Sequence, residues 1–226
     1  MIKTFTGYNL ASGIAPADHE AWYETTYAPS CLANSNLDAL IFNTVRDTIS
    51  GDQTYYGIEE MHFANAAAFD AFQAEHAKDE SLASDARTFR HPAFSVRTDV
   101  VNVDRANVDE VIRNPAARIA TRIQQPREKS VLGYDIVAPM SAEDYDRWLW
   151  DIHSPDLFLN PHLDRIVYNT VTGTVSGSET FFRISELHIK DDSTHEAWAT
   201  WHAENPVSVE RSPVGKTDFR FYVLCR

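Results

Sequence analysis

The chain has 226 residues, enough for one large domain or two small ones with a buried core. Hydrophobic residues make up 43% of the chain and aromatic residues 12%, which excludes a disordered protein and favours a packed one. The formal net charge of −13 argues against broad electrostatic binding to nucleic acid or to an anionic membrane.

The first half of the chain predicts two helices, over residues 15–28 (APADHEAWYETTYA) and 65–79 (NAAAFDAFQAEHAKD). These helices alternate with segments that match the strands predicted for the second half. Residues 104–130 are charged and interrupted by prolines, so we expect a linker with a single helical turn there.

The second half predicts four strands and two helices. Alternating or β-branched residues indicate strands over 132–139, 164–175, 180–190 and 218–226. Residues 142–154 and 193–204 are predicted helices, the first capped by Ser141 and the second by Ser193 or Asp192. Pro155 is expected to end the first of these helices or to force its last turn open.

An internal repeat connects the two halves. Gly133-Tyr134 repeats Gly7-Tyr8 at an offset of 126 residues (133 − 7), and the register continues without a gap. The same offset aligns Trp22 with Trp148, Pro29 with Pro155, Asn34 with Asn160, Asn43 with Asn169, Glu60 with Glu186 and His62 with His188. A chance match would not keep one register across so many residue types. We infer a tandem duplication of one β-α-β-β-α-β unit.

Each unit predicts a four-stranded antiparallel sheet with helices on one face, and the bare face of such a sheet has to be buried. We therefore predict an α+β fold of two tandem ferredoxin-like repeats, residues 1–103 and 131–226, joined by the linker 104–130. The two sheets are expected to pack on each other as a barrel within one chain. This pseudo-dimer leaves further association into homo-oligomers open.

Two short motifs carry a resemblance to a known family. Residues 153–155 (HSP) end a predicted helix and residues 184–188 (ISELH) lie in a later strand, and 27–29 (YAP) and 58–62 (IEEMH) repeat them. The chain resembles the EthD-like branch of the dimeric α+β barrel superfamily. The resemblance implies a small, largely apolar pocket in each half. It also implies chemistry such as cofactor-free oxygenation, cyclisation, dehydration or decarboxylation, although some relatives bind haem and some have no known activity.

The first half departs from the family pattern, because Tyr27 stands where the family histidine would be. The resemblance therefore places the principal site in the second half, at His153. An imidazole has an ordinary pKa near neutrality and suits proton transfer as a general acid or base. Equally, a histidine at the end of a helix is stabilised by the helix dipole, which is a purely structural role.

Glu186 and His188 are two residues apart on a predicted strand, so they share one face of it. They can form a hydrogen-bonded pair inside the barrel seam, since a buried charge needs a partner. Alternatively, Glu186 orients a histidine or is itself a base with a raised pKa. Glu60 and His62 are their weaker equivalents in the first half, as Tyr27 is for His153.

Several further residues are candidates for substrate binding. Tyr168 can donate a hydrogen bond to a developing oxyanion, or it is a plain strand aromatic. Asparagine is disfavoured in strands, so Asn169 and its weaker equivalent Asn43 point to a polar contact that is either structural or substrate-facing. The expected apolar surroundings of the substrate are Trp150, Phe158 and Tyr134.

The helix 193–204 carries aromatic residues and histidines at helical spacing. Trp198 and Trp201 are predicted to face the core, and His195 and His202 are predicted to face solvent.

Together with these residues, the resemblance implies a cofactor-independent lyase- or isomerase-type enzyme that dehydrates, cyclises or decarboxylates a small hydrophobic, aromatic or polyketide-like molecule. His153 would move the proton, Glu186 or His188 would orient or relay it, and Tyr168 or Asn169 would hold a substrate oxygen. The alternatives are a cofactor-free or haem-assisted monooxygenase and a non-catalytic binder of an apolar ligand. No cofactor is expected from the motifs present, and no metal site is indicated by a compact ligand signature.

The beginning of the chain, MIKTFTGYNL, turns polar too early for a signal peptide, and no apolar run approaches the roughly 20 residues of a membrane helix. Cys31 and Cys225 are far apart in the sequence and suggest neither a disulfide framework nor a thiolate metal site. We expect a cytoplasmic protein with a small hydrophobic molecule as its partner and with neither nucleic acid nor membrane as one.

Overall fold

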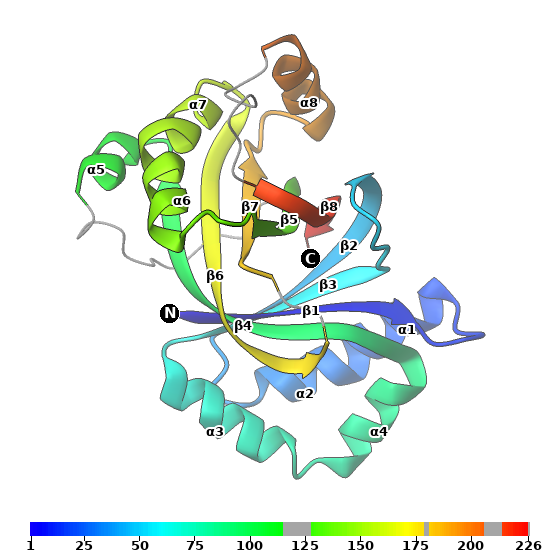
Figure 1. Ribbon diagram of the computed structural model, residues 1–226. Coiled ribbons are helices and arrows are strands. Elements are labelled where there is room, and N and C mark those ends of the chain that lie inside the picture. Colours follow the sequence, from blue (N-terminus) through cyan, green and yellow to red (C-terminus); the bar gives the residue numbers. More distant parts are fainter. Residues whose placement is uncertain (115–127, 179–180, 206–213, 226) are drawn as a thin grey trace.

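Eight strands close into one barrel in the computed structural model, which describes residues 1–114, 128–178, 181–205 and 214–225 (Figure 1). Their order around the barrel is β1-β3-β2-β8-β5-β7-β6-β4, and neighbouring strands are antiparallel. The strands are β1 (Ile2–Leu10), β2 (Ala39–Ser50), β3 (Gly57–Phe63), β4 (Arg90–Asp104), β5 (Glu128–Ile136), β6 (Leu163–Gly177), β7 (Arg183–Ile189) and β8 (Val214–Cys225).

The helices cover the outside of the barrel in two groups. Helices α1 to α4 lie on one side of the barrel and α5 to α8 on the opposite side (Figure 1). The helices are α1 (Pro16–Trp22), α2 (Ala28–Leu32), α3 (Ala66–His76), α4 (Glu80–Phe89), α5 (Val108–Arg113), α6 (Ala142–Trp148), α7 (Ser154–Leu157) and α8 (His195–Glu204). Among the described residues, none of the helices has the length and apolar character to cross a membrane.

Two seams join the halves. Strand β2 pairs with β8, and β4 pairs with β6, so the outer strands of both halves hydrogen-bond to each other. The sequence predicted that two sheets pack on each other as a barrel within one chain; the structure is a barrel, and these two seams close it at both edges. Edge strands expose unpaired N–H and C=O groups, and closure removes those edges.

The elements of the two halves keep the offset found in the sequence. Strands β1 and β5 begin at Ile2 and Glu128, and α1 and α6 begin at Pro16 and Ala142. The short helix α5 lies within the predicted linker, whose residues 115–127 are outside the described residues. Helix α4 was not predicted from the sequence.

The helix before Pro155 does not end at that proline. Helix α6 continues into a π-helical turn, η3 (Leu149–His153), and then into α7, and the first half has a matching turn, η1 (Tyr23–Tyr27), before α2. Of the two outcomes expected at Pro155, the opened last turn is therefore the one found, because a π turn is wider than an α turn.

The helix caps agree with the prediction at one helix and differ at the other. The Ser141 hydroxyl accepts a hydrogen bond of 3.1 Å from the Asp144 backbone N–H, which confirms the predicted cap of α6. Helix α8 is capped by Thr194, whose hydroxyl accepts from the Ala197 N–H, so the predicted cap at Ser193 or Asp192 was wrong.

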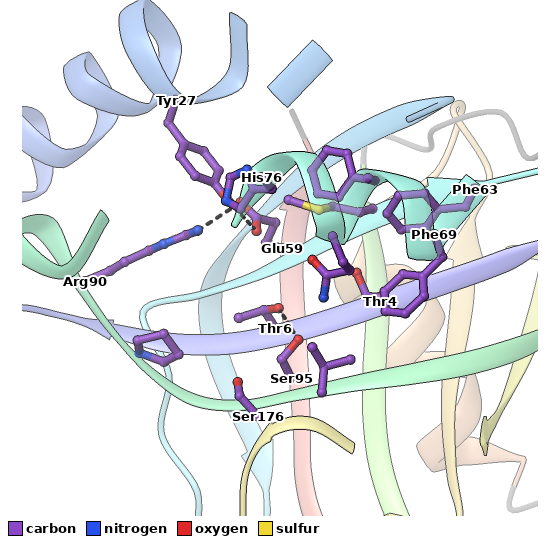
Figure 2. A pocket seen from close by; sticks show the side chains of 15 residues that line it. Thr4, Thr6, Tyr27, Glu59, Phe63, Phe69, His76, Arg90, Ser95 and Ser176 are labelled. Carbon is purple, nitrogen blue, oxygen red and sulfur yellow. Dashed lines mark hydrogen bonds and ion pairs between the residues drawn. The ribbon is translucent and has the colours of Figure 1, made fainter. Parts of the chain in front are cut away.

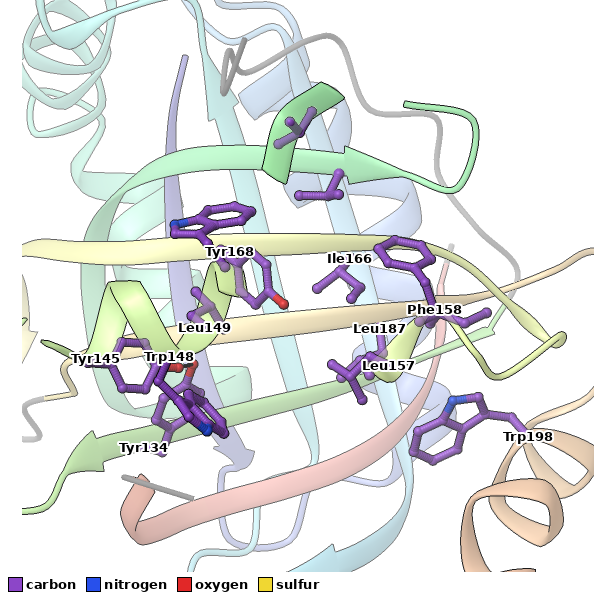
Figure 3. Packing of buried hydrophobic residues seen from close by; sticks show 14 of the residues in the cluster. Tyr134, Tyr145, Trp148, Leu149, Leu157, Phe158, Ile166, Tyr168, Leu187 and Trp198 are labelled. Atoms are coloured by element: carbon purple, nitrogen blue, oxygen red, sulfur yellow. Dashed lines mark hydrogen bonds between the residues drawn. The ribbon is translucent and has the colours of Figure 1, made fainter. Parts of the chain in front are cut away.

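Alternation along the strands divides their side chains between the barrel interior and the helix-facing side. The apolar interior includes Phe5, Ile58, Phe94, Val131, Ile184 and Phe219. The helix-facing side forms two further clusters, one under each group of helices, and Figure 3 shows the second-half cluster. The barrel wall therefore separates an interior layer from two outer layers, and this separation decides which site residues can meet.

Candidate functional site

A cavity of about 240 Å³ lies on the helix-facing side of the barrel, mostly within the first half. Its apolar wall includes Met61, Phe63, Phe69 and Phe72. Its polar lining includes Thr4, Thr6, Tyr27, Glu59, His76, Arg90 and Ser95 (Figure 2). A pocket with apolar walls and a few polar groups at one end is the usual form of a small-molecule site.

Tyr27, Glu59 and Arg90 form a connected cluster at the polar end of the cavity. The Tyr27 hydroxyl donates to Glu59 Oε1 over 3.2 Å, and Arg90 Nη1 donates to Glu59 Oε2 over 2.9 Å. The Arg90 guanidinium carbon also lies 4.3 Å from the Tyr27 ring centre. All three side chains are buried. Arg90 Nε has no partner in the described part of the chain, which leaves one buried donor for a ligand oxygen.

Local structure explains why these side chains meet. Along β3, Glu59, Met61 and Phe63 face the helices, because the side chains of a strand alternate between its two faces. The π turn η1 ends at Tyr27 and carries it toward β3, and Arg90 is the first residue of β4, directly after α4.

The protonation states of the cavity groups follow from burial. Burial raises the pKa of Tyr27 well above its ordinary value, against the lowering effect of Arg90, so the phenol stays protonated. Burial also lowers the pKa of the half-buried His76, so its imidazole is neutral at pH 7. The His76 ring stacks on Phe72 at 5.3 Å and meets the Tyr27 ring edge-on at 6.4 Å. The cavity thus combines a proton acceptor with donors for a negatively charged oxygen.

The repeated carboxylates Glu60 and Glu186 lie inside the barrel and not at this cavity. Lys3 Nζ contacts Glu60 Oε2 at 3.2 Å and Glu186 Oε1 at 2.6 Å. Lys129 Nζ contacts Glu186 Oε2 at 2.6 Å and also pairs with Glu60. We call these four residues the interior tetrad. Each lysine bridges a carboxylate of its own half and one of the other half.

Polar neighbours complete the tetrad. The Asn43 side-chain amide donates to Glu60 Oε1 at 2.7 Å, and that of Asn169 donates to Glu186 Oε1 at 2.9 Å. His188 Nε2 lies 3.2 Å from Glu186 Oε2, and His62 Nε2 lies 3.4 Å from Glu60 Oε2. Both asparagine side chains therefore contact carboxylates of the interior tetrad.

The expectation that Glu186 is a base with a raised pKa was wrong. Burial alone would raise the pKa of Glu186, but Lys129 and Lys3 outweigh burial and hold it well below the ordinary value. The pKa of Glu60 is also lowered, because Lys129 and Lys3 outweigh burial and the charge of Glu186, which would both raise it. The contact between Glu186 and His188 matches the alternative of a hydrogen-bonded pair inside the barrel.

Four predicted substrate-binding residues belong to the cluster on the outer side of the second half: Tyr134, Trp150, Phe158 and Tyr168. Figure 3 shows Tyr134, Phe158 and Tyr168 in this cluster. The Tyr168 hydroxyl hydrogen-bonds the Ser154 hydroxyl at 2.9 Å, and the Trp150 ring meets the Tyr168 ring edge-on at 5.5 Å. These side chains are buried in a packed cluster. Asn169, predicted with them, faces the barrel interior instead.

His153 lies among the second-half helices, where its ring stacks on Trp148 at 4.5 Å. Burial lowers its pKa to about 4, and its Nδ1 has no partner in the described residues. Glu186 and His188 face the barrel interior, so the barrel wall separates them from His153. The predicted relay from His153 to Glu186 or His188 was therefore wrong.

Several site residues were missed from the sequence. Lys3 and Lys129 match at the repeat offset, and that match could have revealed them. Glu59 stands next to Glu60, and strand alternation sends the two side chains to opposite faces. Nothing in the sequence indicated Arg90 or His76, because their role depends on which elements pack together.

A haem group does not fit the described cavity. Pockets for drug-sized ligands have volumes of roughly 300–1,000 Å³, and this cavity of about 240 Å³ is smaller. Its single histidine, His76, is held against Phe72 and Tyr27. In the described part of the chain, no group of three or more His, Cys, Asp or Glu side chains is placed to hold a metal ion.

Comparison with known proteins identifies the fold. No family model matches the chain, and no curated protein matches it. An anthrone oxidase-like protein has a TM-score of 0.61 at 13% identity, covering 100% of this chain and 92% of its own. A candidate monooxygenase from Fusobacterium nucleatum has a TM-score of 0.56 at 10% identity, covering 99% and 92%. A mutant chlorite dismutase from Candidatus Nitrospira defluvii, in complex with cyanide, has a TM-score of 0.61 at 7% identity, covering 100% and 90%.

The chain shares the fold of these solved structures over its whole length. At such low identity the likeness concerns the fold alone, and the activity has to be argued from the cavity.

Proposed function

We propose that this protein is a cofactor-independent enzyme that applies acid–base chemistry to a small aromatic or polyketide-like molecule in the first-half cavity. The supporting observation is that one cavity combines neutral His76, protonated Tyr27 and the unpartnered Nε of Arg90 with apolar walls. The reaction class is that of a lyase or isomerase.

The chemistry begins with His76 as the general base. It removes a proton from a carbon next to a carbonyl group, and the carbonyl oxygen becomes an enolate oxygen. The unpartnered Nε–H of Arg90 donates a hydrogen bond to this oxygen, and the Tyr27 hydroxyl donates a second one by turning from Glu59 Oε1 to the ligand. Return of the proton to another carbon completes an isomerisation. Loss of hydroxide from the neighbouring carbon, which leaves with the proton as water, completes a dehydration, and attack on a second carbonyl closes a ring.

This assignment moves the proton-transferring histidine from His153 to His76. Tyr27, a weaker candidate in the sequence, becomes a hydrogen-bond donor. Glu60, His62, Glu186 and His188 become structural residues of the barrel. Two observations support the change: the first half has a cavity beside its polar cluster, and Arg90 supplies a buried cation there.

The second candidate is a cofactor-free monooxygenase, favoured by the structural neighbours named as an anthrone oxidase-like protein and a monooxygenase. It starts with the same deprotonation. The enolate then reacts with dioxygen, so that a CH₂ group becomes a carbonyl, one oxygen atom enters the product and the other leaves as water. Oxygen consumption distinguishes the two reactions.

The test follows proton removal without knowledge of the natural substrate. The bicyclic ketone 2-tetralone is incubated with the protein in D₂O, and ¹H NMR measures exchange at its acidic CH₂ group. Wild-type protein is expected to accelerate exchange, and His76→Gln is expected to reduce the acceleration by about 100-fold or more, the usual contribution of a general base. Tyr27→Phe should reduce it less, because Arg90 remains.

The matched control is His91→Gln, since His91 is exposed and does not line the cavity. This variant should exchange like the wild type. Exchange that is unaffected by His76→Gln would contradict the mechanism. A product formed only under air, with consumption of oxygen, would select the monooxygenase.

We further propose that the two halves arose by tandem duplication within the EthD-like branch of the superfamily. The repeated element bounds, the paired π turns before α2 and α7, and the matching positions of Tyr27 and His153 support this origin. The same view makes the chain a pseudo-dimer, with a small hydrophobic molecule as its partner and the cytoplasm as its location.

A further inference from the structure

The outer side of the second half contains an arginine that has no counter-ion among the described residues. Arg220, on β8, is partly buried, and its Nε is buried with no hydrogen-bond partner in the described residues. Two other buried arginines, Arg90 and Arg183, each contact a carboxylate, Glu59 or Asp146, at 2.9 Å. Arg220 makes no such ion pair within the described part of the chain. Because burying an unpaired charge is costly, its presence calls for an explanation.

Imidazole and indole rings surround this guanidinium. The Arg220 guanidinium carbon lies 5.3 Å from the centre of the Trp198 ring, and the His202 ring stacks on Trp198 at 5.3 Å. His195 lies 5.4 Å from Trp198. Buried ring nitrogens of His153, His195 and His202 have no partner among the described residues. The prediction that His195 and His202 face solvent was therefore wrong, because both are half-buried against Trp198.

The carboxylates near this cluster lie at its margins. The negative charge of Asp156 acts to raise the pKa of His153, and the charges of Glu128 and Asp47 act to raise the pKa of His195. No carboxylate of the described residues contributes to the pKa shift of His202 or of Arg220. The positive charge is therefore uncompensated between Arg220 and His202.

This cluster occupies the same place in the second half as the cavity occupies in the first. The repeat offset aligns Trp198 with Phe72, His202 with His76 and His153 with Tyr27. The three first-half residues of these pairs line the cavity. Gly133 packs against Phe219 as Gly7 packs against Phe94. Arg220 follows Phe219 in the second half, and Ser95 follows Phe94 in the first half. Ser95 also lines the cavity.

The charge of the two places differs. In the first half, Glu59 neutralises Arg90 beside the cavity. In the second half, the repeat places Ser185 at the position of Glu59, so the carboxylate is missing, and Arg220 has taken the place of a serine. The same location therefore changes from a neutralised pair to an uncompensated cation.

We propose that Arg220, His202, His153 and Trp198 form a second, anion-binding site that takes a small aromatic carboxylate. The planar guanidinium binds the two carboxylate oxygens together, as arginine does in bidentate pairs. The unpartnered imidazole nitrogens of His202 and His153 add hydrogen bonds, and the half-buried His202 ring, which stacks on the buried Trp198, supports the flat body of the ligand. This site is separate from the first-half cavity, so it stands or falls independently of the proposed function.

The experiment uses 2-naphthoate as the probe, with 2-naphthamide as its neutral counterpart and inorganic phosphate as a non-aromatic anion. Isothermal titration calorimetry of the full chain measures each affinity. Arg220→Met removes the charge and keeps most of the side chain. Arg147→Met is the matched control, because Arg147 is an exposed arginine of the same half with ion pairs on the surface.

Naphthoate is expected to bind the wild type at least tenfold more tightly than either naphthamide or phosphate. Arg220→Met should weaken naphthoate binding by about 10- to 100-fold, in line with charge-assisted hydrogen bonds, while Arg147→Met leaves it unchanged. Without ligand, Arg220→Met should melt at the same temperature as the wild type or higher, since it removes an unpaired buried charge.

Equal affinity for naphthoate and naphthamide, or no loss of affinity in Arg220→Met, would overturn the proposal. So would the absence of binding to the wild type. Phosphate binding as tight as naphthoate binding would refute the aromatic specificity. A clear drop in the melting temperature of ligand-free Arg220→Met would show instead that Arg220 serves the fold.

Discussion

The interior tetrad makes a sharp prediction about stability. Lys129→Met removes one of two ammonium groups that neutralise Glu60 and Glu186, and the carboxylates are 0% exposed. Lys3 remains in contact with both. The charge of the tetrad then changes from zero to −1 inside the barrel. Removing one partner of a buried ion pair costs about 3–5 kcal/mol, which is a large part of the roughly 5–15 kcal/mol that stabilises a typical domain.

The loss should depend on pH, because one proton can replace the missing charge. A glutamate with an ordinary pKa of about 4.3 takes up a proton at pH 7 for about 3.7 kcal/mol, at 1.36 kcal/mol per pH unit. His62 and His188, whose pKa values burial lowers, are the other groups facing the carboxylates that can accept it. The folded variant then binds one more proton than the wild type. Its deficit should shrink by up to about 1.4 kcal/mol per pH unit as the pH falls.

Urea unfolding followed by tryptophan fluorescence at pH 8, 7, 6 and 5 measures this deficit. The control is Lys78→Met, since Lys78 is exposed and should change stability by less than about 0.5 kcal/mol. The double variant Lys129→Met with Glu186→Gln restores charge balance and should be more stable than Lys129→Met alone. A deficit below about 1 kcal/mol at pH 7, or one that does not change with pH, would refute this account of the tetrad.

Three further predictions concern the fold. Gly133→Ala places a methyl group into the Phe219 ring and should destabilise the protein by about 1–3 kcal/mol in urea unfolding, whereas the methyl group of Gly173→Ala makes only an ordinary contact of 4.0 Å with Arg97 Nη2 and serves as its control. Because the folded-state pKa of His153 is lowered to about 4, the stability it contributes should be present above about pH 6.5 and be lost between there and about pH 4; His153→Gln should flatten that part of a pH–stability curve. Ser141→Ala removes the cap of α6 and should lower the free energy of unfolding by about 1 kcal/mol; no change would mean that water replaces the cap.

Sequence periodicity determined much of the architecture by local rules. The offset between the halves, the strand alternation and the Ser141 cap depend on residues close in the chain or on the repeat itself. The barrel could be predicted because two sheets with bare faces have to bury them. Closure at the edges was not predictable in the same way, because it depends on the pairing of β2 with β8 and of β4 with β6, strands that lie far apart in the sequence.

The candidate sites depended on the tertiary structure. Glu59 and Glu60 are neighbours of one residue type, yet one faces the cavity with Arg90 and the other faces the interior with Lys3. His76 acquires its surroundings only when α3 packs on the barrel, and Arg220 only when β8 pairs within it. Side-chain chemistry is written in the sequence, but burial and charge pairing are properties of three-dimensional neighbours. Those neighbours decide which histidine is neutral, which arginine is unpaired and where a ligand can bind.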